Sequence, residues 1–427
     1  MTSLIIITVS TLLLAAYLFD LTSAKTKIPS VILLLLLGWL LKIVVTLLDI
    51  EIPDLTPTLP ILGTIGLILI VLEGALELEL DRSKKKVFNK SLVSAVLPMV
   101  IISVGLAYIF KLFGLFSFRD GLMNAIPLSV ISSAIAIPTA VNLSPKLKEF
   151  VTYESSLSDI LGVLFFNFIT LNYIYNWDSI GHFGLQFIII IIGSFVATII
   201  LTLLLSKIDH HIKFAPIILL IILIYTISKI YHLPGLIFIL LFGLFMNNFT
   251  LFKNIKIFKR LDFSVLDKES QSFKELTSEA TFLIRALFFL VFGFLIETSE
   301  LLNTETLFWA IGIIIGILII RAIFLKLINM PLRPLLYIAP RGLITILLFL
   351  EIQPINKINF VNKPLIIQII VLSVFVMMIG MMITDEEKDG NKEEIKKGKE
   401  EEISEFEHKL VVKEPDEDLL DSVDPQQ

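Results

Sequence analysis

Long apolar runs separated by short polar stretches fill most of the chain. A helix that crosses a bilayer needs about 20 mostly apolar residues. About thirteen segments fit, so the pattern predicts an all-α polytopic membrane protein. Their expected limits are 3–19, 31–48, 60–78, 91–113, 121–143, 150–174, 184–206, 214–230, 234–249, 277–297, 306–328, 335–352 and 363–384.

The loops between these segments predict how the chain is oriented, because Lys and Arg concentrate in cytoplasmic loops. If the N-terminus is outside, alternate loops are basic, as in 82–90 and 253–274. Loops 49–59 and 298–305 carry acids but neither Lys nor Arg. We therefore expect a multi-pass protein of the cell (inner) membrane, with an outside N-terminus and a cytoplasmic C-terminus.

Composition excludes several classes of function. The chain is 56% hydrophobic and only 18% charged, and it contains no Cys. Disulfides and thiolate sites are therefore excluded. No His/carboxylate spacing suggests a metalloenzyme, and no basic patch suggests nucleic acid, so we expect no cofactor and no nucleic-acid partner. Residues 385–427 are rich in Glu, Lys and Asp and are expected to form a disordered acidic cytoplasmic tail.

Charged residues inside the spans are the candidates for chemistry, because they are costly in lipid. The sixth span holds Glu154 near its inner end and Asp159 about a turn and a half deeper. No neighbour in the sequence neutralises Asp159, so its carboxylate must pair, bind a cation or take up a proton. Alternation between the last two states would couple the movements of cation and proton. For Glu154 we expect a bidentate pair with Arg321 of the eleventh span.

Two spans are expected to be broken. The fifth contains Pro138, and the twelfth contains Pro340 and Gly342. Broken helices at matching places in two halves point to a transporter's substrate site, with helices four to six matching helices eleven to thirteen in an inverted repeat. Simple proline kinks are the alternative. Arg341 is expected to balance half-helix ends and nearby carbonyls, or else to snorkel to the interface.

At these residues the sequence resembles the monovalent cation:proton antiporter family, of the sodium/proton exchanger (NhaP-like) type, over most of residues 1–384. Residues 154–159 read Glu-Ser-Ser-Leu-Ser-Asp and look like the family's E-S-L-L-N-D motif. Residues 72–78 and the pair Arg341-Gly342 also have counterparts. Two departures stand out. Ser158 replaces the family's Asn, and Ala136-Ile137-Pro138 replaces its T-D-P, so that an isoleucine stands for an aspartate.

The resemblance implies an architecture. A core of helices 91–174 and 306–384 would move against a dimerisation scaffold of helices 3–78 and 214–297, with 184–206 as a linker helix. Helices five and twelve would be unwound and would cross near mid-membrane. A homodimer in the lipid bilayer is expected on the same ground.

The resemblance also implies roles for residues. Asp159 would be the shared cation and proton site, with Ser158 and Thr139 as neighbouring oxygen groups. Glu154 would pair with Arg321, and Arg341 would stabilise the crossing.

The expected function is alternating-access exchange of a monovalent cation for protons, with Na⁺ first and Li⁺ or K⁺ open, in pH homeostasis. With one titrating carboxylate in the core, one-for-one exchange would be electroneutral. A K⁺-selective channel or gated conductance of related fold, and an organic-solute transporter, remain alternatives. The expected helices show neither a nucleophile nor a catalytic pair, so we do not expect an enzyme.

Overall fold

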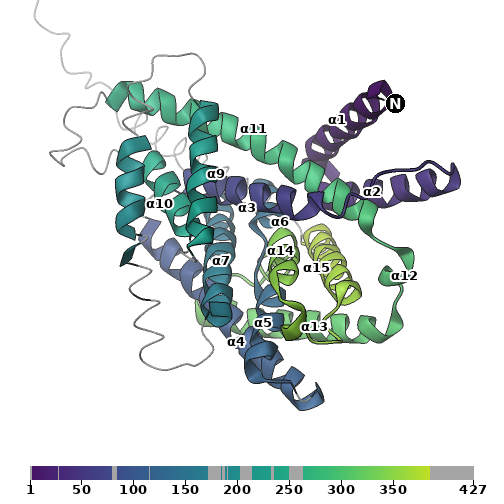
Figure 1. The fold of residues 1–427 in the computed structure, drawn as a ribbon. Coiled ribbons are helices and arrows are strands. Elements are labelled where there is room, and N and C mark those ends of the chain that lie inside the picture. Colours follow the sequence, from purple (N-terminus) through teal and green to yellow (C-terminus); the bar gives the residue numbers. More distant parts are fainter. Residues whose placement is uncertain are drawn as a thin grey trace, which may run out of the picture. The chain divides into compact units, whose positions relative to one another are not determined.

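Figure 1 presents the protein as a computed structural model. It describes residues 2–26, 28–78, 84–114, 116–171, 184, 188–189, 191–201, 214–231, 235–249 and 263–384. Within these ranges the regular structure is helical and no strand occurs. Residues 1–384 form one compact unit. Residues 385–427, the expected acidic tail, lie outside the described residues.

Eight described helical segments are long and apolar enough to cross a membrane. They are α1 (Thr2–Thr26), α2 (Ser30–Leu47), α3 (Thr58–Glu77), α4 (Lys85–Gly114), α5 with α6 (Phe118–Thr139), α11 (Phe263–Leu295), α13 (Thr304–Leu327) and α15 (Lys363–Ile383). Shorter apolar helices cover Ile191–Leu201, α9 (Phe214–Ile230) and α10 (Gly235–Asn247). Helices suit these sequences, because an α-helix satisfies its own backbone hydrogen bonds in lipid. The predicted all-α polytopic membrane fold is confirmed.

The outward faces of several helices are apolar. Leu14 of α1 is 66% exposed, and Phe308 and Ile315 of α13 are 77% and 51% exposed. In water such faces would drive association, whereas in a bilayer they contact acyl chains without cost. The pattern of exposure therefore agrees with a protein that is surrounded by lipid.

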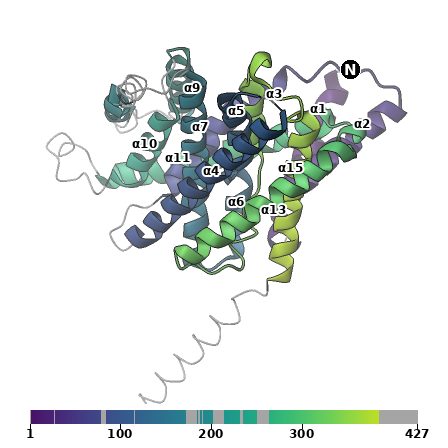
Figure 2. The ribbon, with the colours of Figure 1, turned by 90° about the horizontal axis from the view of Figure 1, so that it is seen from below.

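Helix contacts gather in two groups (Figures 1 and 2). α4 packs against α5, α13 and α7 (Pro145–Leu171), and α13 packs against α15. In the other group α2 and α3 pack against α11, and α3 packs against α10. Small residues permit the closest approach, since a Cβ added at Gly293 of α11 would lie 2.4 Å from the Leu35 carbonyl oxygen of α2. Because α3 also contacts α6, α7 and α14 (Leu343–Glu351), it joins the two groups.

The fifth and twelfth spans are both interrupted. α5 (Phe118–Ser129) ends before an extended stretch over 130–132, and α6 (Ser133–Thr139) then continues into a 3-10 turn over Ala140–Asn142. In the twelfth span, residues 338–342 are non-helical, and α14 starts at Leu343. Each span thus has a segment of free backbone beside a short helix.

The position of the first break corrects a prediction. Pro138 does not break the fifth span, because it lies inside α6, one residue before that helix ends. So late in a short helix, its missing N–H removes only one hydrogen bond. The break occurs at 130–132, where the backbone is bonded to other elements. The Ile131 N–H donates to Ser158 Oγ at 2.9 Å, and the Ser132 N–H donates to the Pro340 carbonyl oxygen at 2.9 Å.

α11 also differs from its expected limits. The tenth span was expected over 277–297, but residues 263–276 are the first part of the same continuous helix of 33 residues. Phe273 is fully buried there, and the Ser270 hydroxyl donates to the Met246 carbonyl oxygen of α10 at 2.7 Å. These contacts stabilise residues 263–276 as a continuation of the helix that forms the tenth span. Residues 250–262 lie outside the described ranges.

Candidate functional site

Asp159 lies near the middle of α7, a helix of 27 residues, and is 1% exposed. Its Oδ2 accepts a hydrogen bond from the backbone N–H of Ser133 at 3.0 Å and another from the Ser133 hydroxyl. Both donors stand at the first residue of α6, where helical N–H groups lack partners within the helix. The break in the fifth span therefore supplies the donors that face the buried carboxylate.

The second oxygen of this carboxylate is free. Oδ1 of Asp159 is buried without a hydrogen-bond partner, and no ion pair to Asp159 occurs among the described residues. An ionised carboxylate that is buried without a partner on one oxygen costs roughly several kcal/mol of free energy, as other buried unpaired charges do. A cation or a proton on Oδ1 would remove that cost. The group is thus prepared to hold one or the other.

Two further buried oxygens near the break lack partners. Ser132 Oγ belongs to the extended stretch, and Ser156 Oγ lies three residues before Asp159, on the same side of α7. A Cβ added at Gly74 of α3 would lie 2.7 Å from Ser156 Oγ, so this side of α7 faces α3. Hydroxyl and carboxylate oxygens suit hard cations. Within the described ranges no group of three or more His, Cys, Asp or Glu residues could hold a metal ion.

Glu154 and Arg321 form a buried ion pair. The two terminal nitrogens of the guanidinium donate to the two carboxylate oxygens, each at 2.8 Å, and the side chains are 3% and 1% exposed for Arg321 and Glu154. The Ser94 hydroxyl also donates to Glu154, and Arg321 Nε donates to the Leu335 carbonyl oxygen at 2.8 Å. Because the pair satisfies itself, Arg321 does not neutralise Asp159.

Arg341 is fully enclosed at the second break rather than directed to the interface. Its Nε donates to the Leu128 carbonyl oxygen at 2.9 Å, and one terminal nitrogen donates to that of Ser129 at 3.1 Å. The other terminal nitrogen donates to the Ala339 carbonyl oxygen. Leu128 and Ser129 end α5, where helical carbonyls lack partners and carry partial negative charge. The guanidinium thus supplies positive charge and donors where the fifth span is interrupted.

The two breaks touch directly. Besides the bond from Ser132 N–H to the Pro340 oxygen, Gly342 approaches the fifth span so closely that a larger residue would displace side chains of that span. An added Cβ would lie 2.7 Å from Ile135 Cδ1 and 2.9 Å from Ser132 Oγ. Pro340 and Gly342 therefore belong to the crossing, as the sequence predicts, whereas Pro138 does not.

The hydroxyl groups of Ser158 and Thr139 form hydrogen bonds with the backbone and not with Asp159. Ser158 Oγ accepts the Ile131 N–H and so anchors the extended stretch to α7. The Thr139 hydroxyl donates to the Ile135 carbonyl oxygen of its own helix, at 2.8 Å. Ser133, which contacts Asp159, is absent from the sequence-based candidates. The Ser132-Ser133 pair next to an apolar run is the one local sign of a helix start there.

Comparisons with known proteins agree with this geometry. The profile of the family described as sodium/hydrogen exchanger, transmembrane, matches residues 9–384. The sodium proton antiporter MjNhaP1 from Methanocaldococcus jannaschii, solved at pH 8, superimposes with a TM-score of 0.66 at 19% identity, covering 88% of this chain and 99% of that one.

A second structure of MjNhaP1, an electron-microscopy map, gives a TM-score of 0.63 at 20% identity, with coverages of 90% and 95%. At these identities the likeness shows the fold. A comparison with curated protein sequences finds no match. The match of the family profile spans both broken helices, the Glu154–Arg321 pair and Asp159. This chain therefore belongs to the sodium/hydrogen exchanger family.

Proposed function

We propose that the protein exchanges a monovalent cation for protons across the membrane, with both substrates competing for Asp159. The observation that carries the proposal is the carboxylate itself. It is buried, it receives donors on Oδ2 from Ser133 only, and Oδ1 is free. Since such an acid is strongly disfavoured as a bare anion, it is protonated when no cation is bound. Binding of a cation then releases the proton, and protonation expels the cation.

The proposed cation is Na⁺, the ion named in the family's description. Its ligands would be Asp159 Oδ1 and Ser132 Oγ, with the Ser156 hydroxyl on the side that faces α3. In this assignment Ser158 and Thr139 do not bind the ion, because each hydroxyl already serves the backbone in the way described above. Ser158 positions the break instead. Li⁺ and K⁺ are the ions against which selectivity should be measured.

A single carboxylate at the site supports a stoichiometry of one cation for one proton. The nearby Glu154 carboxylate is occupied by its bonds to Arg321 and Ser94, so Asp159 is the carboxylate proposed to exchange the two ions. Ile137 stands where the family's second aspartate is expected. Exchange of one charge for one charge moves no net charge, and we propose an electroneutral cycle.

Alternating access would arise from movement of one helix group against the other. The proposed moving core is α4–α7 with α13–α15, and the scaffold, which would also form a homodimer, includes α1–α3 and α9–α11. Serine and glycine where α7 meets α3 would offer the cation a path between them. The alternation of basic loops supports a cell membrane location with the N-terminus outside.

Everted vesicles with a pH-sensitive dye test the proposal. Wild type should release protons from the vesicle lumen when Na⁺ is added, and Asp159→Asn should not. The matched control is Asp54→Asn, because Asp54 is an exposed loop residue and should leave exchange unchanged. Normal exchange by Asp159→Asn would end the proposal. Repeating the assay in proteoliposomes with Na⁺, Li⁺ and K⁺, with and without an imposed potential, would identify the ion and the charge balance.

A further inference from the structure

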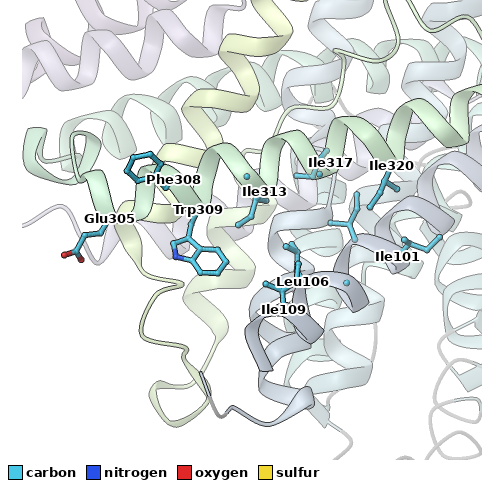
Figure 3. Close-up of a pocket in the computed structure, with 13 residues that line it drawn as sticks. Ile101, Leu106, Ile109, Glu305, Phe308, Trp309, Ile313, Ile317 and Ile320 are labelled. Atoms are coloured by element: carbon cyan, nitrogen blue, oxygen red, sulfur yellow. The ribbon is translucent and has the colours of Figure 1, made fainter. Parts of the chain in front are cut away.

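A groove of about 490 Å³ lies between α4 and α13 on the outer surface of the bundle (Figure 3). Three of its lining residues are glycines, Gly105 of α4 and Gly312 and Gly316 of α13. A Cβ added at any of them would meet nothing within 4 Å. No side chain of the described residues fills the space beside these glycines. This groove, which we call the glycine groove, is therefore open to the molecules that surround the protein.

The surroundings of the glycine groove are lipid. Ile101 and Ile109 of α4 line it and are 45% and 37% exposed, and Phe308 of α13 is 77% exposed. The groove extends along α13 from Glu305 to Ile320, about 22 Å at 1.5 Å per residue. One leaflet of the hydrocarbon core is about 15 Å deep. The groove is therefore long enough to hold one acyl chain from the headgroup level inwards.

Polar groups mark only one end of the glycine groove. Glu305 and Trp309 are four residues apart on α13, hence on the same side of the helix, and Figure 3 shows the indole nitrogen on the side of the ring nearer Glu305. Glu305 is exposed, and its carboxylate forms no ion pair with any residue that the structure describes. The Trp309 ring packs on Phe360 and Phe113, which holds it in place. Trp near the end of a membrane-spanning helix is typical of the membrane interface, and Trp309 lies in the second turn of α13.

We propose that the glycine groove is a binding site for one phospholipid with a primary-amine headgroup. The ammonium group would pair with Glu305, the indole N–H of Trp309 would donate to a phosphate or ester oxygen, and an acyl chain would lie over the three glycines. An anionic headgroup would be repelled by Glu305. A choline headgroup has no N–H with which to donate to the carboxylate. The charge at the end of the groove therefore selects the amine lipid.

Native mass spectrometry of the full-length protein in mild detergent tests the site. The protein is given equal amounts of phosphatidylethanolamine, phosphatidylcholine and phosphatidylglycerol, and retained lipid is counted for each chain. Wild type should retain one phosphatidylethanolamine that Gly312→Leu loses. Gly193→Leu is the matched control, since a Cβ there also meets nothing within 4 Å but Gly193 is outside the groove. Leucine favours helix more than glycine does, so neither change should unfold the chain.

Glu305→Gln separates headgroup recognition from filling of the groove. It should reduce the preference for phosphatidylethanolamine over phosphatidylcholine about two- to fivefold, the range of an exposed ion pair. Equal retention of the three lipids by wild type and Glu305→Gln would overturn the proposal, as would retention of the same lipid by Gly312→Leu. If Gly312→Leu instead converts a dimer into monomers, the groove seats a second copy of the chain, and the lipid proposal is wrong.

Discussion

Removing Arg321 from its pair with Glu154 should be among the most destabilising single changes in the protein. The guanidinium donates three hydrogen bonds of 2.8 Å, two to Glu154 and one to the Leu335 carbonyl oxygen, and neither charged side chain is more than 3% exposed. Breaking a buried pair by removing one partner costs about 3–5 kcal/mol, because the other charge is left unpaired. Arg321→Met should therefore lower the free energy of unfolding by about that amount.

The double variant tests the reason for this loss. In Arg321→Met with Glu154→Gln no charge remains, so only polar groups such as the Leu335 carbonyl lose a partner. The loss should then be about 1–2 kcal/mol, well below the sum of the two single changes. Unfolding by added denaturing detergent, followed by loss of helicity, gives the comparison.

A matched control comes from the partly exposed pair of Lys363 and Glu300. Its N–O distance is also 2.8 Å, but the Lys363 side chain is 48% exposed. Lys363→Met should cost about 0–1 kcal/mol. If the buried pair costs no more than this exposed one, or if the single losses simply add in the double variant, the reasoning about desolvated charge is refuted.

Two further predictions concern the broken helices. Gly342→Ala should cost about 1–3 kcal/mol of stability and slow transport, because the added methyl group would overlap Ile135 and Ser132. The control Gly193→Ala should change stability by no more than about 0.5 kcal/mol. Equal effects of the two variants in thermal-denaturation and exchange assays would contradict the crossing geometry. Ser133→Ala should raise the KM for Na⁺ about tenfold at constant pH, because the carboxylate loses a donor that favours its charged, cation-binding form. Thr139→Val should leave that KM unchanged, and a larger effect from Thr139 than from Ser133 would reverse the assignment of the two hydroxyls.

Much of the architecture follows from the sequence, for a physical reason. In lipid, backbone groups must be bonded within a helix, so apolar runs alone indicate where helices lie. The charge and shape of a buried side chain also restrict which partners it can have. An Arg inside the membrane favours a bidentate carboxylate, and the sixth span offered Glu154, which the structure brings to Arg321.

The position of the first break could not be read in the same way. Pro127 and Pro138 are the strongest local helix breakers in the fifth span, yet each lies inside a helix and the chain leaves the helix at 130–132. That departure depends on bonds to Pro340, about two hundred residues away in the chain, and to Ser158. Such partners are invisible to local propensity. A proline predicts a lost hydrogen bond, not where a tertiary contact will replace one.

The hydroxyl groups around Asp159 show the same limit. The fifth, sixth and neighbouring spans contain many hydroxyl residues, and the resemblance to the antiporter family pointed to Thr139 and Ser158. Which of them faces the carboxylate depends on where α6 begins, and α6 begins at Ser133 because of the break. An error of a few residues in the break therefore changes the predicted ligand set, although Asp159 itself stays the centre of the site.

The most direct measurement is proton release from the purified protein on addition of Na⁺, in weakly buffered solution with a pH dye. If cation and proton share the free oxygen of Asp159, each chain should release about one proton as Na⁺ binds, and Asp159→Asn should release none. Binding of Na⁺ without release of a proton, or undiminished release from Asp159→Asn, would contradict the account.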